Sequence, residues 1–364
     1  MMNPFVVTAT RSMRKYTARV IEHLVKFPSF SPISEIINGM DLLQTDSFAD
    51  GEIEVAVTRS VRGMDVILFS SSARNEANLT VEEAKIELYH AIDALKRSQA
   101  RNIIIFEPFI SSSRSDRTTR RNSVGLWIHF KTLASLGARH ILTYQLHSKI
   151  SQSMLDPSIC TLDDIHAQTL LEKYLCDHYI RDLEYLRNTV RPNWAFCSVD
   201  AGGEHQIRDF ADAFGSSLVI AHKQRDYSRV NSVKSVSILS AEPVEGKILW
   251  IYDDLVDTAS SVETLIRALA PLKPAEVNII AVHAVFSPPA AQRLNRLQAE
   301  GLLKRVIVTD SVWPSPEPIS SLEVVSSTEL SAQLIHTFIT NQSMSKILEV
   351  FNAEKYLKTA SLFS

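Results

Sequence analysis

The segment Ile248–Ser261, with the sequence ILWIYDDLVDTASS, decides the fold prediction. It begins as an apolar run, Ile248–Tyr252, continues with carboxylates and hydroxyls, and leads into a helical pattern that opens at about Val262. In open α/β sheets, ligands bind beyond the carboxyl ends of the strands, and the N–H groups at a helix start attract anions. The segment therefore predicts a strand, a polar binding loop and a helix.

Similar apolar runs recur along the chain, and segments with helical periodicity separate them. The expected strands are Val66–Phe69, Ile103–Phe106, His140–Leu146, Trp194–Val199, Leu218–Ala221, Ile248–Tyr252, Val277–Phe286 and Val306–Thr309. The expected helical stripes are Ala84, Leu88, Ile92 and Leu95, and Val262, Leu265, Ile266 and Leu269. Such an alternation is typical of parallel sheets covered on both faces, so the sequence predicts an α/β fold with mostly parallel sheets flanked by helices.

Composition and charge limit the class of protein. The chain has 364 residues, with 38 Lys+Arg against 41 Asp+Glu, a net charge of −3, which excludes general nucleic-acid or anionic-membrane binding by bulk charge. No apolar run approaches the ~18 residues of a membrane span, and the first residues lack a secretory h-region. Cys160, Cys176 and Cys197 share no C-x-x-C spacing and favour a reducing compartment, so we expect a cytoplasmic protein.

The length suggests about two domains. The polar stretch 148–164 marks the expected boundary, which gives an N-terminal domain over 1–164 and a C-terminal domain over 165–325. The proline-rich loop 313–321 is not a long helix. Residues 326–364 are expected to form a helical extension that packs back, with amphipathic stretches at Glu329–Thr340 and Met344–Leu357.

The polar part of the first segment has the chemistry of a site for a phosphorylated sugar. Asp253 and Asp254 are able to accept hydrogen bonds from sugar hydroxyls, and the N–H groups at the helix start form an anion cradle with nearby hydroxyls. The hydroxyls belong to Thr258, Ser260 and Ser261. The alternative is that Asp253, Asp254 and Asp257 merely cap the helix.

Other polar motifs are weaker when taken alone. Asp200–Gly203, with the sequence DAGG, allows close approach of a phosphate or is an ordinary strand–helix turn. Lys223 and Arg225 share one side of an extended strand, either to stabilise a transferring phosphate or as a solvated strand end. A lone His147 at a strand end is more often structural, and Asp50-Gly51 is a hairpin-turn signal.

The sugar-phosphate segment resembles the ribose 5-phosphate loop of type I phosphoribosyltransferase folds, and the chain resembles the ribose-phosphate pyrophosphokinase (PRPP synthetase) family. The motifs that carry this resemblance occur in the family's order: Phe48–Glu52 (FADGE), Ser60–Val66 (SVRGMDV), Arg114–Arg117 (RSDR), Leu146-His147, Asp200–Gly203, Lys223–Arg225 (KQR) and, loosely, the tail Ala360–Ser364. The resemblance implies two tandem phosphoribosyltransferase-like domains.

The resemblance also implies a reaction and a set of residues. The reaction transfers the diphosphoryl group of Mg·ATP to ribose 5-phosphate, which gives PRPP and AMP. The implied catalytic residues are Lys223 and Arg225. The implied ribose 5-phosphate site comprises Arg225, Asp253, Asp254, Asp257, Thr258, Ala259, Ser260 and Ser261. The implied ATP site comprises Phe48, Asp50, Gly51, Glu52, Arg114, Ser115 and His147, and His147 and Asp200 would hold Mg²⁺. In the family the Phe48–Glu52 loop comes from a neighbouring subunit, which implies a homodimer or a higher oligomer such as a hexamer.

Four positions depart from the family pattern. Ser115 stands where the family has Gln, Thr119 and Gln145 stand where it often has Asp, and Ser260 replaces a glycine. These changes leave open a non-catalytic regulatory subunit, although such a subunit has no chemical use for the retained His147 and Lys223. A phosphoribosyltransferase that consumes PRPP is the third alternative, and the ATP-type motifs of the first half argue against it.

Overall fold

The computed structural model describes residues 3–118, 121–199, 204–225, 233–315 and 317–360. The chain forms two compact units. Unit 1 comprises residues 1–166, 311–313 and 326–348, and unit 2 comprises 167–310, 314–325 and 349–364. The expected C-terminal extension is thus divided, because its first part belongs to unit 1 and its last part to unit 2.

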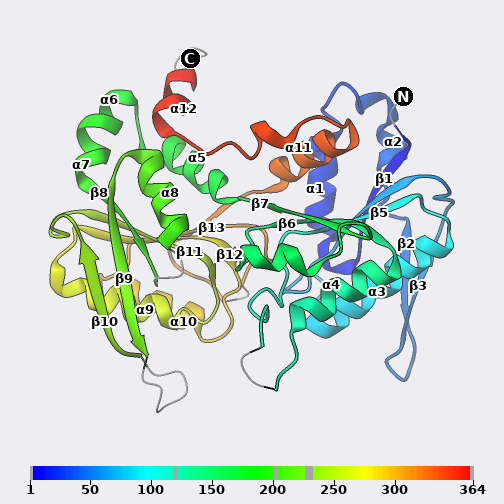
Figure 1. Cartoon of the computed structure of the whole chain (residues 1–364), viewed down its shortest axis with the longest axis horizontal. Helices are drawn as coiled ribbons and strands as arrows, with labels where there is room; N and C mark the ends of the chain where they lie inside the picture. The colour runs from blue at the N-terminus through cyan, green and yellow to red at the C-terminus, as the bar shows by residue number, and fades with distance from the viewer. Residues whose placement is uncertain (1–2, 119–120, 200–203, 226–232, 316, 361–364) are drawn as a thin grey trace. The chain divides into compact units, whose positions relative to one another are not determined.

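Unit 1 contains a parallel five-stranded sheet in the order β1-β4-β5-β6-β7. Its strands are β1 (Phe5–Ala9), β4 (Asp65–Phe69), β5 (Asn102–Glu107), β6 (Ala138–Tyr144) and β7 (Thr161–Ile165). A separate antiparallel hairpin joins β2 (Leu43–Ser47) to β3 (Ile53–Val57) and projects from the unit in Figure 1.

Helices cover both faces of the unit 1 sheet (Figure 1). They are α1 (Arg14–Leu24), α2 (Ser34–Ile37), α3 (Val81–Arg97), α4 (Gly125–Leu136) and α11 (Thr328–Ile339). The apolar stripe of α3 packs with Val66 and Leu68 of β4, whereas Tyr16 of α1 contacts Phe69, which points to the opposite face. Tyr16 also hydrogen-bonds Ser331 of α11, so this late helix is part of the unit 1 core. Short 3-10 turns occupy Arg11–Met13, Ser31–Ile33, Lys149–Met154 and Met344–Lys346.

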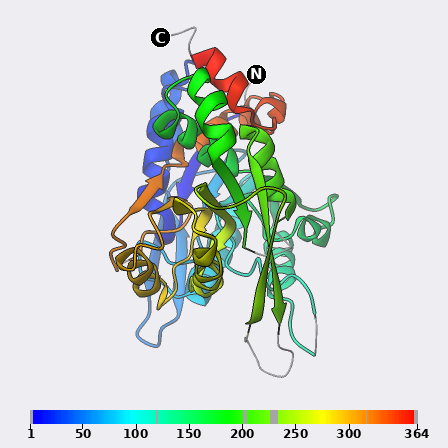
Figure 2. The same cartoon turned by 90° about the vertical axis from the view of Figure 1, so that its left-hand side faces the viewer.

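Unit 2 contains a seven-stranded sheet in the order β10-β9-β8-β11-β12-β13-β14. Its strands are β8 (Trp194–Ser198), β9 (Ser217–Arg225), β10 (Val233–Ser240), β11 (Ile248–Val256), β12 (Glu276–Ala284), β13 (Arg305–Thr309) and β14 (Leu322–Val325). All neighbours are parallel except β9 and β10, which form the antiparallel ribbon in Figure 2. Parallel strands buried on both faces account for the continuous apolar runs in the sequence.

The helices of unit 2 also pack on two faces. They are α5 (Gln168–Tyr179), α6 (Leu183–Tyr185), α7 (Arg191–Asn193), α8 (Glu204–Phe214), α9 (Ser260–Leu269), α10 (Ala290–Ala299) and α12 (Ala353–Ala360), with a π-helical turn at Leu186–Val190 and a 3-10 turn at Ala270–Leu272. The α9 stripe packs with Ile251 of β11, while Phe210 of α8 contacts Tyr252, the next residue, on the other face.

The expected α/β class is confirmed and each expected strand is present, but several boundaries differ: β6 ends at Tyr144 rather than Leu146, and β12 ends at Ala284 rather than Phe286. Strand β11 continues to Val256, and α9 begins at Ser260 rather than at about Val262. The stretch Met344–Leu357 is not one helix: it consists of a 3-10 turn and a separate α12. Asn352 explains the second start, because its Oδ1 accepts a hydrogen bond from Lys355 N at 2.9 Å, as helix-capping Asn does.

Candidate functional site

Two aspartates at the carboxyl end of β11 form the first part of the candidate site. Because β11 extends to Val256, Asp253 and Asp254 lie inside the strand and their side chains alternate across the sheet. Asp254 is 7% exposed, whereas Asp253 is only partly buried. The Oδ1 atom of Asp253 accepts a hydrogen bond from Asp254 N at 3.1 Å. Asp253 is therefore the more accessible carboxylate for a ligand.

The backbone between β11 and α9 turns sharply through a left-handed residue. Ala259 has φ +58°, a conformation that costs a non-glycine residue about 1 kcal/mol or more. The first hydrogen bond donated within the helix runs from Glu263 N to Ala259 O at 2.9 Å. The N–H groups before Glu263 have no acceptor within the helix, and the side chains of Ser260 and Ser261 are exposed. The turn therefore presents N–H and hydroxyl donors, as an anion site requires.

An arginine of the next helix supports this turn. Nη1 of Arg293, in α10, donates to the carbonyl oxygen of Thr258 at 2.9 Å, and its Nε lies 3.4 Å from Glu263 Oε2. Glu263 in turn accepts from Arg296 at 2.6 Å and from Arg267 at 3.2 Å. The carbonyl of Thr258 is thus held by α10, which fixes the turn between β11 and α9.

Lys223 and Arg225 lie on β9 at the same edge of the unit 2 sheet. Their backbone register pairs Lys223 with Val236 and Arg225 with Val233 of β10, and the period of two puts both residues on one face. Residues 217–220 of β9 pair with β8, so the last part of β9 runs beyond the carboxyl end of β8. The side chains of Lys223 and Arg225 lie outside the described residues.

The register permits a rough measure of the separation between the lysine and the aspartates. Tyr252 pairs with Ser198, and Ser198 pairs with Ile220, so Lys223 is level with Leu255 along the strands. Strand β8 alone separates β9 from β11, so their backbones are roughly 10 Å apart. The backbone of Lys223 is thus two strands away from the backbone of Asp253 in the same sheet.

The expected diphosphate loop Asp200–Gly203 follows β8, between β9 and β11 in the sheet order. The loop, and with it the expected metal ligand Asp200, lies outside the described residues. Thr119 and the tail Ser361–Ser364 also lie outside them.

Arg114 and His147 follow neighbouring strands of unit 1. Arg114 comes after β5 and His147 after β6, and the two strands are parallel and adjacent, so both residues lie at the carboxyl edge of the sheet. Both side chains are exposed. Ser115 binds the start of α4: its Oγ accepts from Gly125 N at 2.9 Å and its carbonyl from Leu126 N at 3.2 Å. This contact is structural and leaves the hydroxyl hydrogen available to a ligand.

The aromatic and acidic segment Phe48–Glu52 is the turn of the β2–β3 hairpin. Phe48 N donates to Glu52 O at 2.7 Å, Gly51 N donates to Phe48 O at 3.0 Å, and Asp50 Oδ1 accepts from Glu52 N at 3.1 Å. Gly51 has φ +93°, which explains the glycine in the turn. The Phe48 side chain is 52% exposed, unusual for a large apolar group, so it is available to another molecule.

Sequence reasoning missed a carboxylate that shapes the end of β6. Asp164, in β7, accepts a hydrogen bond from Leu146 N at 2.9 Å, directly before His147. Burial raises the pKa of Asp164, while the Leu146 N–H opposes this increase. The preceding Gln145 has φ +42°, and its N–H donates to Ile165 O at 3.0 Å. The signal was the carboxylate pair inside the strand TLDDI, whose residues 161–164 lie in the polar stretch that was expected to mark the domain boundary.

The described residues contain no group of three or more His, Cys, Asp or Glu side chains that is able to hold a metal ion. Mg²⁺ in nucleotide enzymes is commonly bound through one or two protein groups plus the phosphates of the substrate. Exposed His147 at a strand end is chemically suited to supply one such protein group. A preformed cage of protein ligands is not needed.

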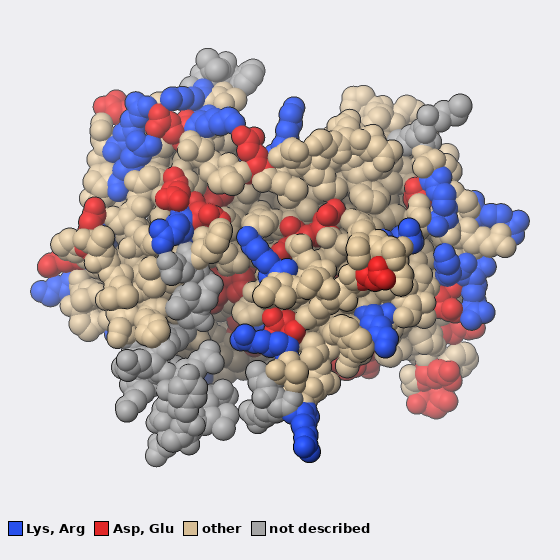
Figure 3. Space-filling model, viewed as in Figure 1, with Lys and Arg blue, Asp and Glu red and all other residues tan. Residues whose placement is uncertain are grey.

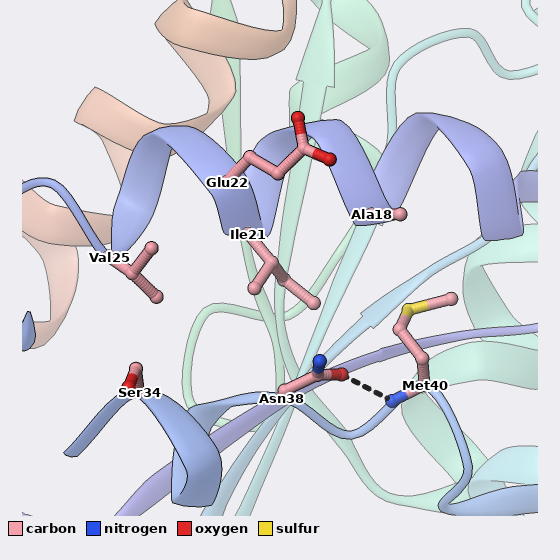
Figure 4. A pocket seen from close by; sticks show the side chains of 7 residues that line it. All are labelled: Ala18, Ile21, Glu22, Val25, Ser34, Asn38 and Met40. Atoms are coloured by element: carbon pink, nitrogen blue, oxygen red, sulfur yellow. Dashed lines mark hydrogen bonds between the residues drawn. The ribbon is translucent and has the colours of Figure 1, made fainter.

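A surface cavity of about 370 Å³ lies elsewhere in unit 1 (Figure 4). Its wall consists of Ala18, Ile21, Glu22, Val25, Ser34, Asn38 and Met40. Asn38 Oδ1 accepts from Met40 N at 3.1 Å, so part of the polar lining is engaged internally. The cavity contains a single carboxylate, and none of the residues considered above lines it.

Charged groups of both signs mix on the surface shown in Figure 3. Near α12, for example, Glu354 pairs with Arg187, Arg191 and Lys358, and these partners lower its pKa to about 2. Among the described helices, none has the length and apolar character required to cross a bilayer.

Family models match both halves of the chain. The model described as the N-terminal domain of ribose phosphate pyrophosphokinase matches residues 6–137. The model described as the phosphoribosyl transferase domain matches residues 176–316. The first range covers β1, β4 and β5 of the unit 1 sheet, and the second covers β8 to β13 of the unit 2 sheet.

Individual proteins agree with the family models. Ribose-phosphate pyrophosphokinase of Bifidobacterium longum is 31% identical over 86% of this chain and 87% of its own length. That of Synechococcus elongatus is 32% identical over 74% of each chain. The crystal structure of phosphoribosylpyrophosphate synthetase from Mycobacterium smegmatis superposes with a TM-score of 0.76 and 26% identity, over 93% of this chain and 99% of that one. The chain therefore belongs to the ribose-phosphate pyrophosphokinase family of transferases.

Proposed function

We propose that this chain, as a ribose-phosphate pyrophosphokinase, transfers the β,γ-diphosphoryl group of ATP to O1 of ribose 5-phosphate through the unit 2 residues described above. The observation that carries this assignment is the shared edge of one sheet. The aspartates and donor-rich turn after β11 and the lysine–arginine end of β9 all lie at its carboxyl edge. Ligands of open α/β sheets bind at this edge.

Ribose 5-phosphate binds at residues 253–261 in this proposal. The 5-phosphate lies against the turn Asp257–Ser261, where N–H groups and serine hydroxyls donate to it. Asp253 accepts from the ribose hydroxyls, and the more buried Asp254 supports the strand end. Ser260 replaces a glycine of the family pattern yet still supplies an N–H and a hydroxyl.

The chemical step is a displacement at the β-phosphorus of ATP. O1 of the sugar forms the new P–O bond, the bond from the β-phosphorus to the α–β bridging oxygen breaks, and AMP leaves with that oxygen, while the O1 proton passes to solvent. Lys223 and Arg225 stabilise the negative charge on the transferring group, an effect that is strongest where water is excluded. Mg²⁺, held by His147 and Asp200, would neutralise phosphate charge and orient the diphosphoryl group.

ATP binds at unit 1 residues in this proposal. Arg114 pairs with the phosphates, and Ser115 donates its hydroxyl hydrogen. The exposed Phe48 stacks on the adenine of a neighbouring subunit, where Asp50, Gly51 and Glu52 complete the contact, so the working form is a homodimer or a higher oligomer.

The three cysteines are buried and unpaired, which supports a reducing compartment such as the cytoplasm.

The test combines an assay with a matched pair of variants. Purified protein is incubated with ribose 5-phosphate and Mg·ATP, and AMP and PRPP are measured. The wild type should form both in equal amounts, and Lys223→Ala should lower turnover at least 100-fold with nearly unchanged ATP binding. The control is Lys304→Ala, an exposed lysine at the opposite edge of the same sheet, which should keep full activity.

Three results would contradict the proposal. The absence of AMP at any Mg²⁺ or phosphate concentration would favour a regulatory subunit. Formation of AMP without PRPP would indicate a different acceptor. Full activity of Lys223→Ala would remove the assigned catalytic residue.

A further inference from the structure

Unit 1 contains a buried network of hydrogen-bonded polar groups that the family motifs do not include. Glu107, the last residue of β5, is 0% exposed, and His129, in α4, is 1% exposed. Glu107 Oε2 lies 2.6 Å from His129 Nε2. Nδ1 of the same ring lies 2.9 Å from the hydroxyl oxygen of Tyr89, in α3. Three elements are therefore joined through one histidine ring.

The carboxylate of Glu107 and the hydroxyl of Tyr89 determine which atoms of this network donate and which accept. A carboxylate only accepts hydrogen bonds, so Nε2 of His129 carries the hydrogen between them. In the neutral ring Nδ1 then accepts, and Tyr89 donates. Burial and the nearby Glu107 charge raise the pKa of Tyr89 to about 12, so the phenol keeps its hydrogen at working pH. The ring orientation is thus determined from both sides.

The second oxygen of Glu107 leads to the loop that carries Arg114. Glu107 Oε1 accepts from Ser72 Oγ at 3.3 Å, and Ser72 Oγ accepts from Ser111 Oγ at 3.0 Å and from Ser111 N at 3.4 Å. Ser111 lies three residues before Arg114. The buried network therefore ends at the backbone N–H and the side-chain hydroxyl of Ser111, in this loop.

Two further contacts hold the same loop. The Nζ atom of Lys85, whose side chain is 10% exposed, donates to Ser112 Oγ at 3.0 Å. Gly125, at the start of α4, approaches so closely that an added Cβ would lie 3.3 Å from Ser115 Oγ. Helix α4 carries both His129 and the N–H groups that bind Ser115, so loop, strand and helix form a closed circuit.

Stability alone does not explain this arrangement. Replacement of both partners of a buried polar pair by apolar residues is often nearly neutral, so such a pair contributes little to stability. In this protein the hydrogen bonds run from Tyr89 through His129, Glu107 and Ser72 to Ser111, in the loop that follows β5. A polar network of this kind specifies one loop conformation at the expense of others.

We propose that Glu107 and His129 are positioning residues, which act through Ser72 to hold the 111–115 loop in the conformation that presents Arg114 to the phosphates of ATP. The inference rests on the proposed assignment of Arg114 to ATP. It assigns two buried residues, together with Ser72 and Lys85, to nucleotide affinity rather than to the chemical step.

The experiment measures ATP kinetics and amide hydrogen exchange of the loop in the full-length protein. Ser111→Ala removes the hydroxyl that links the loop to Ser72, and it should raise the KM for ATP about fivefold. Glu107→Leu should raise it about tenfold or more, with kcat within about twofold and the KM for ribose 5-phosphate unchanged. Glu107→Gln, which keeps an acceptor oxygen, should restore most of the affinity. Exchange at 109–118 should accelerate in step with KM.

The control removes a carboxylate at the other end of the same sheet, whose arginine partner is 35% exposed. Asp65, at the start of β4, accepts from Arg101 Nε at 2.9 Å and Asn102 Nδ2 at 2.8 Å. Asp65→Leu should lower stability without changing the KM for ATP. If Glu107→Leu does not fold, Glu107→Leu/His129→Leu, which leaves no unpaired charge, takes its place.

Each outcome decides the inference. Unchanged loop exchange in Glu107→Leu and Ser111→Ala would overturn it, and so would faster exchange with an unchanged KM for ATP. An equal rise in KM for Asp65→Leu would also overturn it, because the effect would then be general. A wild type without AMP formation would instead refute the proposed function, and ATP binding by calorimetry would then replace KM as the readout.

Discussion

Glu172 offers a sharp test of the unit 2 core. It lies on α5, is 2% exposed, and its Oε2 has no hydrogen-bond partner among the described residues. Burial, followed by the charge of Asp209, raises its pKa from 4.5 to about 8, against a small opposing effect of Lys173. The folded chain therefore keeps a proton on Glu172 at a pH where the unfolded chain has lost it.

The sign and the magnitude follow from proton linkage. Between pH 4.5 and about 8 the folded state binds more protons than the unfolded state, so the contribution of Glu172 to stability falls as the pH rises. Each tenfold difference in proton affinity corresponds to about 1.4 kcal/mol. The loss accumulates to about 3–5 kcal/mol at pH 8. Glu172→Gln, which has no proton to lose, should escape it.

The assay is urea denaturation of wild type and Glu172→Gln at several values of pH from about 3.5 to about 8.5. The difference in the free energy of unfolding should be nearly constant below pH 4.5 and should then grow in favour of the variant by about 3–5 kcal/mol. Glu245→Gln removes an exposed carboxylate of the same unit and serves as the control. A difference between Glu172→Gln and wild type that does not change with pH would refute the reasoning, because Glu172 would then ionise normally in the folded state.

Three further predictions concern the proposed ligand sites. Ala259→Gly should leave the free energy of unfolding unchanged or raise it by up to about 1 kcal/mol. Ala259→Val should lower it by about 2 kcal/mol and raise the KM for ribose 5-phosphate, because a β-branched residue is strained at φ +58°. Equal melting temperatures of the two variants would contradict this prediction. Asp164→Ala should lower the free energy of unfolding by about 2 kcal/mol and raise the KM for ATP, since Leu146 N loses its charged acceptor before His147; an unchanged KM would separate Asp164 from nucleotide binding. Phe48→Ala and Lys223→Ala should each be nearly inactive when expressed alone. Their co-expression should restore about a quarter of wild-type activity, because half of randomly paired dimers are mixed and each mixed dimer has one intact site out of two. No recovery would mean that the hairpin completes the ATP site of its own subunit.

Periodicity predicted the main strands and helices, because buried parallel strands are apolar throughout and helices have an apolar stripe. The four predicted positions of the α9 stripe, Val262, Leu265, Ile266 and Leu269, are all buried. Strands with mixed composition escaped this criterion. Strand β7 has the sequence TLDDI, with only its last residue fully buried, and β10 lies at an edge of the sheet. Half-exposed edge strands lack the continuous apolar run that identifies central strands.

Motifs indicated where candidate residues lie along the chain, but not what supports them. The sequence pattern at Asp253–Ser261 correctly predicted a polar segment between a strand and a helix, yet it did not show that Arg293 binds Thr258 O. Glu107 and His129 are far apart in sequence and belong to no motif, so their contact depends on the packing of α4 against β5. The roles of Lys223, Arg225, Arg114 and His147 remain predictions, because no ligand contact tests them.

The return of the chain to unit 1 has a practical consequence for work with fragments. Phe27 stacks on His336 at 4.2 Å between ring centroids, and Tyr16 and Tyr144 both hydrogen-bond Ser331. A fragment that stops at residue 166 would therefore lack helix α11, expose the apolar surface of unit 1 that this helix covers, and be insoluble. A soluble version of unit 1 requires residues 326–348 to be joined to residue 166 by a designed linker. An affinity tag should be placed outside residues 326–348.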